Sequence, residues 1–226
     1  MDTRFLGHSC FEIRGDGVTI LVDPFHSGNP KAAVSADEVD PDVVLLTHGH
    51  GDHYGDVVGI AKRTGATVVA LVEIANELGE QGVEDVRDPN IGGTVTFDWG
   101  WVKLTPAWHT STTPNGTATV PAGLLIDVGG TVVYHLGDTA LFSDLQLVAR
   151  RGDQVDVALV PIGGHYTMDR YDAVTAVEFV NPRTVIPCHY DTFPPIETDA
   201  EAFKADVESG TGASVAILAP GETHSV

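Results

Sequence analysis

The chain has 226 residues and a formal net charge of −20, from 12 Lys and Arg against 32 Asp and Glu. This balance excludes nucleic acid as the expected partner, because binding to phosphates depends on clustered basic side chains, and a pair such as Arg150-Arg151 is no cluster. No cationic leader is visible and no apolar run is long enough to cross a bilayer, so we expect a soluble, cytoplasmic protein without a membrane partner.

The N-terminal segment predicts two strands. Phe5 to Ile13 has the composition of a strand and carries His8, and Thr19 to Val22 is a second strand that ends at Asp23. His8 alone carries little information, because a single histidine packs in a core as readily as it serves a site. Asp23 precedes Pro24, and an Asp-Pro pair can simply form a turn.

The segment Thr47-His48-Gly49-His50-Gly51-Asp52-His53 places four metal-binding side chains within six positions. It follows the short apolar strand Val43 to Leu46, and the stretch from His53 to Arg63 after it has helical spacing. The four side chains therefore occupy a strand-to-helix turn. The alternative is an exposed polar turn with no ligand.

The backbone of this turn favours metal binding. His48 and His50 lie two positions apart, so in extended backbone both imidazoles project to the same side. Asp52 and His53 fall at the predicted helix start, where the helix dipole stabilises a carboxylate and disfavours imidazolium. The neutral imidazole is the form that binds metal.

Three later apolar runs also end in residues with ligand atoms. Trp101 to Trp108 ends at His109, Thr131 to Leu136 ends at Gly137-Asp138, and Thr184 to Cys188 ends at His189. Four such runs are harder to obtain by chance than one short motif. Because the ligands would have to converge, residues 48 to 189 cannot be divided by a linker, and we predict one domain over residues 1–226.

The remaining pattern indicates a mixed α/β fold. We predict helices at Glu73 to Gln81, Leu141 to Arg151, Tyr171 to Val180 and Asp199 to Ser209, the last opened by a Thr198-x-x-Glu201 capping box. Further strands are predicted at Val68 to Val72, Thr94 to Phe97, Ala122 to Val128, Val155 to Pro161 and Val215 to Leu218. The two cysteines, Cys10 and Cys188, lack the spacing of a metal or redox pair, which favours a reducing compartment.

The segment His48-x-His50-x-Asp52-His53 resembles the His-x-His-x-Asp-His motif of the metallo-β-lactamase superfamily, whose members add a histidine, an aspartate and a histidine at later strand ends. The resemblance implies a four-layer αββα sandwich with the site at one edge, between the two sheets. The segments Leu6 to Phe11, Asp23-Pro24 and Pro161 to His165 look like a branch of metal-dependent hydrolases similar to ascorbate-6-phosphate lactonase.

The same resemblance implies a site with two divalent ions. One ion would be held by His48, His50 and His109, and the other by Asp52, His53 and His189, with Asp138 bridging them. Zn²⁺ is the ion first expected, and Mn²⁺ or Fe also suits such nitrogen and oxygen ligands. In the family, the aspartate at the position of Asp23 fixes the site, which agrees with the tendency of ligand histidines to donate their free N–H to a carboxylate.

Asp52 and His165 are the residues to which we assign catalytic roles. His165 lies in a glycine-rich turn after the apolar strand Val157 to Val160, and loops at strand ends concentrate binding residues. We expect His165 to contact substrate or deliver a proton, the alternative being a loop histidine that bonds only backbone. The resemblance favours a place for His8 near the cleft and the substrate, with core packing equally open.

The expected function is hydrolysis of a small ester, lactone or phosphoester by a hydroxide that bridges the two ions. Two divalent ions, two aspartates and a hydroxide leave the site at about +1, so a small anionic substrate is compatible with the acidic surface. Two alternatives remain: a metal-dependent binding or sensor protein without turnover, and a nuclease, which the acidic charge disfavours. The sequence gives no indication of oligomeric state.

Overall fold

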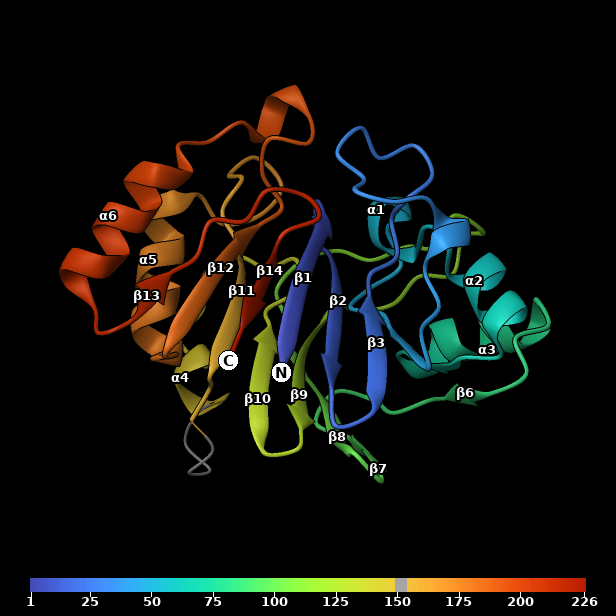
Figure 1. Cartoon of the computed structure of the whole chain (residues 1–226). Helices are drawn as coiled ribbons and strands as arrows, with labels where there is room; N and C mark the ends of the chain where they lie inside the picture. Colours follow the sequence, from blue (N-terminus) through green and yellow to red (C-terminus); the bar gives the residue numbers. More distant parts are fainter. Residues whose placement is uncertain (149–153) are drawn as a thin grey trace.

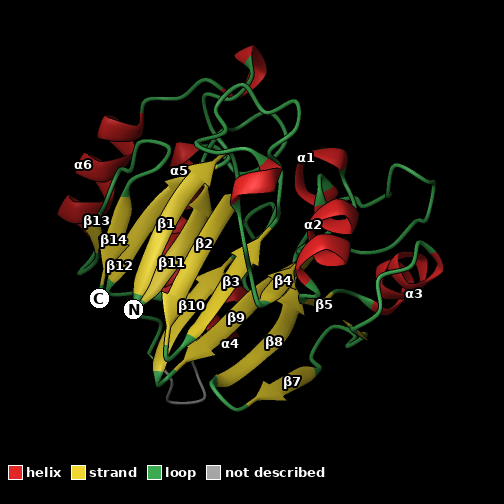
Figure 2. Cartoon of the chain, turned by 45° about the vertical axis from the view of Figure 1, so that its right-hand side comes forward, coloured by secondary structure: helices red, strands yellow, loops and turns green. Residues whose placement is uncertain are grey.

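The structure is a computed structural model that describes residues 1–148 and 154–226. Two seven-stranded mixed sheets pack face to face, and helices cover the outer face of each, so that four layers are stacked (Figures 1 and 2). This is the predicted αββα sandwich. Among the described residues, no helix has both the length and the apolar character that crossing a bilayer requires.

The first sheet has the strand order β14-β1-β2-β3-β4-β5-β6. Its strands are β1 (Asp2–Gly7), β2 (Cys10–Gly15), β3 (Val18–Val22), β4 (Val43–Leu45), β5 (Thr67–Val69), β6 (Val86–Arg87) and β14 (Thr223–Ser225). Strands β1 to β3 are antiparallel neighbours, whereas β3 to β6 are parallel. The outer face carries α1 (Gly51–Tyr54), α2 (Val57–Thr64) and α3 (Val72–Glu80).

The second sheet has the order β13-β12-β11-β10-β9-β8-β7. Its strands are β7 (Thr94–Phe97), β8 (Gly100–Pro106), β9 (Ala122–Val128), β10 (Thr131–His135), β11 (Val157–Pro161), β12 (Thr184–Cys188) and β13 (Ser214–Val215). Strands β7 to β10 are antiparallel neighbours and β10 to β13 are parallel. The outer face carries α4 (Leu145–Val148), α5 (Arg170–Val180) and α6 (Ala200–Gly210).

The apolar runs are continuous because the inner strands are covered on both faces. In β3, Ile20 packs between the two sheets while Leu21 packs under the helices, and in β11 Leu159 and Val160 divide in the same way. Successive side chains of a strand point to opposite faces, so a strand buried on both faces has no polar alternation. The core between the sheets and the two helix-covered cores therefore come from the same strands.

Several predicted boundaries are wrong in informative ways. The strand predicted over residues 5–13 is a hairpin, β1 and β2, joined at His8-Ser9. The helix predicted over residues 53–63 is two helices, α1 and α2, separated at Gly55 and Asp56. The strand predicted to reach Val72 ends at Val69, because Val72 already begins α3.

The helices of the second half also differ in detail from the prediction. The helix predicted over residues 141–151 begins only at Leu145, and its predicted end, with the Arg150-Arg151 pair, lies outside the described residues. Helix α6 is capped by Asp199, whose carboxylate accepts from the Ala202 N–H at 2.9 Å, and not by Thr198. Strand β14 was not predicted. It is a three-residue edge strand recognisable only by its pairing with β1.

The break between α1 and α2 generates a test of the fold. Gly55 has φ +37°, and an added Cβ would lie 2.3 Å from the Pro24 carbonyl oxygen. We expect Gly55→Ala to destabilise the protein by about 1–3 kcal/mol, since the conformation and the close approach both require glycine. The matched control is Gly59, inside α2, where an added Cβ meets nothing within 4 Å.

Alanine at position 59 should raise the free energy of unfolding by about 0.5–1 kcal/mol, because alanine is the better helix former. Urea unfolding curves of both variants provide the measurement. Equal stability of the two alanine variants would contradict the assigned role of Gly55.

Candidate metal centre

The predicted ligands reach one place because of strand direction. Strands β1, β3 and β4 run parallel to one another in the first sheet, as do β8, β10 and β12 in the second. The carboxyl ends of these strands therefore share one edge of each sheet. The residues that follow them are, in order, His8, Asp23, the turn from Thr47, the segment to His109, Asp138 and His189.

The first group of side chains contains His48, His50 and His109, whose ligand atoms all lie within 4.8 Å of one another. His48 Nε2 and His50 Nδ1 are 3.0 Å apart, and the His48 and His109 rings are perpendicular, with centroids 5.4 Å apart. His48 is fully buried, whereas His50 and His109 are half-buried. This group therefore has a side that faces solvent.

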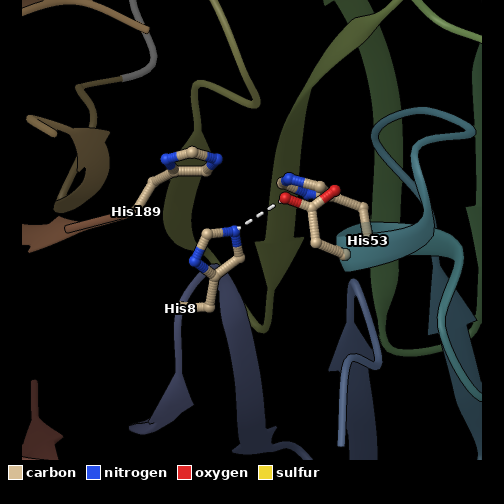
Figure 3. A group of neighbouring side chains, drawn as sticks. His8, His53 and His189 are labelled. Atoms are coloured by element: carbon tan, nitrogen blue, oxygen red, sulfur yellow. Dashed lines mark hydrogen bonds and ion pairs between the residues drawn. The ribbon is translucent and has the colours of Figure 1, made fainter. Parts of the chain in front are cut away.

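The second group contains Asp52, His53 and His189, and includes His8 as well, again within 4.8 Å (Figure 3). The His53 and His189 rings are nearly parallel, at 20°, with centroids 5.6 Å apart. His8 Nε2 lies 3.1 Å from Asp52 Oδ2. The turn at His8 thus brings a side chain of the N-terminal hairpin into the site. The sequence had left open whether His8 packs in the core or lies near the cleft.

Asp138 lies between the two groups. Its Oδ2 is 3.5 Å from His109 Nε2 and 3.1 Å from His189 Nε2, and its Oδ1 is 3.4 Å from His53 Nε2. The carboxylate is 2% exposed. With His48 and His53, whose ring centroids are 4.1 Å apart, it forms a third group of ligand atoms that joins the first two, and this is the position predicted for a bridging carboxylate.

Asp23 holds the first turn of the site from behind. Its carboxylate accepts from the Thr47 N–H at 2.8 Å and the Thr47 hydroxyl at 2.6 Å, and it pairs with His53 Nδ1 at 2.8 Å. Thr47 Oγ1 is in turn 3.0 Å from His48 Nδ1. These contacts direct the Nε2 atoms of both histidines toward Asp138, which is how a neighbouring carboxylate orients imidazole ligands.

The protonation preferences of these groups follow from burial and from the carboxylates. Burial lowers the pKa of His48 well below its usual value. Burial also opposes the charged form of His53, but Asp138 and Asp23 outweigh it and hold the His53 pKa well above the usual value. Burial would raise the pKa of Asp138, but His189 and His53 outweigh it and hold that pKa well below its usual value.

At His53, two carboxylates therefore act against the neutral imidazole that the sequence predicted. The expected cause was the dipole at the start of a helix over residues 53–63, but α1 has only four residues. Two carboxylates, with atoms 2.8 Å and 3.4 Å from the ring nitrogens, act at shorter range than that dipole. They stabilise a positive charge at the centre of the site.

The residues present fit a bound cation. Among the described residues, His53 Nε2, Asp138 Oδ1 and His189 Nδ1 are buried atoms without a hydrogen-bond partner. Leaving such atoms unpaired costs about 1–3 kcal/mol each. Two of these atoms, His53 Nε2 and Asp138 Oδ1, lie 3.4 Å apart. A cation coordinated by both would satisfy both.

His165 is not brought into either group. It lies in the loop after β11, is exposed, and packs its ring edge-on against Tyr166 with centroids 4.6 Å apart. The start of this loop is close to the site, since an added Cβ on Gly163 would lie 2.2 Å from the His189 carbonyl oxygen. His165 itself therefore lies outside the cluster of ligand atoms, although its loop begins close to that cluster.

The loop that carries His109 is fixed by residues not predicted from the sequence. Ser111 Oγ accepts from the Gly49 N–H at 3.0 Å, which ties the loop to the His48-His50 turn. Glu77, which is 8% exposed in α3, accepts from the Thr113 hydroxyl at 2.6 Å and the Asn115 amide at 2.8 Å. The available signal was a glutamate on the apolar face of α3, beside Ile74 and Leu78.

A family model and the sequences of known proteins both match most of the chain. A model described as a beta-lactamase superfamily domain matches residues 2–189. UPF0173 metal-dependent hydrolases from Methanopyrus kandleri and Thermus thermophilus are 49% and 45% identical. The first alignment covers 99% of both chains, and the second covers 98% of this chain and 97% of its relative.

Solved structures agree. Igni18, a metallo hydrolase from Ignicoccus hospitalis, is 39% identical with a TM-score of 0.91, covering 99% of this chain and 97% of that one. CmlA, a diiron β-hydroxylase from Streptomyces venezuelae, shares the fold alone, with a TM-score of 0.79 at 19% identity, covering 100% of this chain and 54% of CmlA. The similarity to ascorbate-6-phosphate lactonase remains a prediction. The match over residues 2–189, together with relatives of nearly equal length, means that the chain belongs to the metallo-β-lactamase superfamily and, within it, to the UPF0173 metal-dependent hydrolases.

Proposed function

We propose that the chain is a hydrolase that holds two divalent ions and cleaves a small ester, lactone or phosphoester. The observation that carries this proposal is the convergence of seven predicted ligands in two groups, which a third group of His48, His53 and Asp138 connects. Divalent ions bound there would lower the pKa of a coordinated water toward neutrality and withdraw charge from a substrate oxygen. Zn²⁺ is the first candidate, and Mn²⁺ or Fe suits the same donors.

Each group of residues would bind one ion. His48, His50 and His109 would hold the first ion, and Asp52, His53 and His189 the second, with Asp138 between them. Asp23 would keep His53 and, through Thr47, His48 in the tautomer and orientation that binding requires. Burial of Asp138 and His53 excludes water, which strengthens the electrostatic interactions within the site.

The open side of the site supports a small substrate. His50, Asp52 and His109 are half-buried, and they form the part of the site that a substrate could approach from solvent. His165, in the loop that packs against the His189 backbone, is our candidate for contact with substrate or proton delivery from the rim. Because CmlA catalyses a hydroxylation on the same fold, the fold does not by itself specify the reaction.

Metal removal provides the first test. A ligand that binds only the folded state at 100 times its dissociation constant stabilises the protein by about 2.7 kcal/mol. We expect chelation of the purified protein to lower its melting temperature and restoration of Zn²⁺ or Mn²⁺ to raise it again, with two ions per chain by mass spectrometry. In Asp138→Asn, the stabilisation by metal should be largely lost, because the shared ligand is weakened.

The control for this charge removal is Asp98→Asn. Asp98 is exposed in the β7–β8 turn, at the opposite end of β8 from His109. The Asp98→Asn variant should show the same change in melting temperature with metal as the native protein. A stoichiometry of one ion per chain in the native protein would refute the dinuclear part of the proposal.

Hydrolysis of a substrate panel provides the second test. Lactones, phosphodiesters, phosphomonoesters and carboxylic esters should be assayed with Zn²⁺ or Mn²⁺ added to the metal-free protein. For any substrate turned over, we expect Asp52→Ala and Asp138→Asn each to lower kcat/KM by at least about 100-fold, since an interaction of this kind is worth two to three orders of magnitude. Full activity of Asp52→Ala would show that Asp52 has no part in the reaction.

The same panel tests the alternatives. A protein that binds two ions tightly and turns over nothing in the panel would support the metal-dependent binding or sensor protein. Nuclease activity would instead require binding to RNA or DNA that weakens steeply with salt, which a gel-shift series at increasing salt would detect.

A further inference from the structure

The turn between β1 and β2 holds a histidine in an unfavourable backbone conformation. His8 has φ +61°, in the left-handed region, and is only 1% exposed to solvent. A non-glycine residue in this region costs about 1–2 kcal/mol. Such strain persists where the surroundings over-determine the conformation, and it clusters at functional sites.

Three hydrogen bonds over-determine His8. Figure 3 shows the one that its ring makes to a carboxylate oxygen beside His53. Its Nε2 is 3.1 Å from Asp52 Oδ2, and its Nδ1 is 2.8 Å from Thr192 Oγ1. Its carbonyl oxygen accepts from the His189 N–H at 2.8 Å. The His8 ring also packs on the His189 ring, with centroids 4.1 Å apart.

The direction of the two ring hydrogen bonds follows from the chemistry of the partners. A carboxylate only accepts, so His8 Nε2 carries the hydrogen and donates to Asp52. In a neutral imidazole the other nitrogen then accepts, so the Thr192 hydroxyl donates to Nδ1. Hydrogen bonds therefore run in one direction from Thr192 through His8 to Asp52.

We propose that His8 is a positioning residue that aligns Asp52 with His189, so that affinity for the second ion depends on the chain of hydrogen bonds from Thr192 to Asp52. Asp52 follows β4 in the first sheet and His189 follows β12 in the second. His8 contacts both, through its side chain and its carbonyl oxygen. By fixing one oxygen of the Asp52 carboxylate, it fixes the direction of the other.

The first group has no such dependence. His48 is held by Thr47, and the loop of His109 is held through Ser111 and Glu77. Loss of His8 should therefore act on one ion and leave the other. This inference rests on the proposed function in assuming a second ion, but it concerns binding and not turnover.

Two variants cut the chain of hydrogen bonds at different points. His8→Asn keeps a residue type that tolerates left-handed backbone but is too short to reach Asp52. Thr192→Val removes the hydroxyl at nearly constant shape, and Thr192→Ser retains it. His224→Asn is the control, because His224 lies in β14 beside Thr3, toward the opposite end of β1 from His8.

Competitive titration of the metal-free proteins with Zn²⁺ and a chromophoric chelator measures the two binding steps without substrate. We expect His8→Asn and Thr192→Val to bind the first ion as the native protein does and the second about 10–100-fold more weakly, the usual effect of removing a residue that orients a ligand. Thr192→Ser and His224→Asn should behave as the native protein. At saturating Co²⁺, all variants should give the native absorption spectrum.

Three results would overturn the proposal. Unchanged affinity for the second ion in both His8→Asn and Thr192→Val would remove the dependence. Equal weakening of both ions would indicate a general packing role. A changed spectrum of His8→Asn at saturating Co²⁺ would make His8 a direct ligand, as its membership of the second group of ligand atoms allows.

The titration also separates this proposal from the proposed function. A native protein that binds two ions but hydrolyses nothing refutes the hydrolase and leaves the role of His8 standing. A native protein that binds fewer than two ions refutes both at the first step, before any variant is compared.

Discussion

The buried carboxylate of Asp138 is the group on which the arrangement of the site depends. A negative charge that is removed from water is strongly unfavourable unless opposite charge or hydrogen-bond donors compensate it. Here the compensation comes from imidazoles of both groups, at distances of 3.1 to 3.5 Å. One of its oxygens nevertheless has no hydrogen bond. The protein alone thus leaves part of the negative charge of Asp138 uncompensated, and a bound cation would compensate it.

The topology of the two sheets explains how so many polar groups meet without disrupting a core. Each one follows the carboxyl end of a strand, so the strand itself can contribute mostly apolar side chains to the layers between sheets and helices. His8, Asp23 and His189 have positive φ, between +46° and +61°. The chain therefore turns sharply at three of the positions where it leaves a sheet, and these turns aim the side chains inward.

The two groups of ligands are anchored differently. The first is held by the local contact of Thr47 with His48, and by the His109 loop, which Ser111 fixes to Gly49 and Glu77 fixes to α3. The second joins residues 8, 52 and 189 through the side chain and the carbonyl oxygen of His8. Both groups combine residues that follow strands of both sheets, so both depend on how the sheets pack.

The sequence by itself determined the strands that end in candidate ligands, because strand periodicity and the spacing of the motif at residues 48–53 are local properties of the chain. It also showed Asp23 as an acid at the end of an apolar run, but the role of Asp23 at the site came from the family resemblance. The break at Gly55 was not visible, because it depends on the approach of the Pro24 carbonyl oxygen. Nor was the capping role of Asp199, since the sequence predicted the cap one position earlier, at Thr198.

Only the tertiary structure decided which ligands share a group, that His8 belongs with Asp52, and that His165 lies outside the cluster. The contact of His8 with Thr192 spans 184 positions in the sequence, and that of Glu77 with Thr113 spans 36. Hydrogen bonds over such separations form only when two sheets have packed. The periodicity of a strand specifies which side chains face inward, but not which of them will meet.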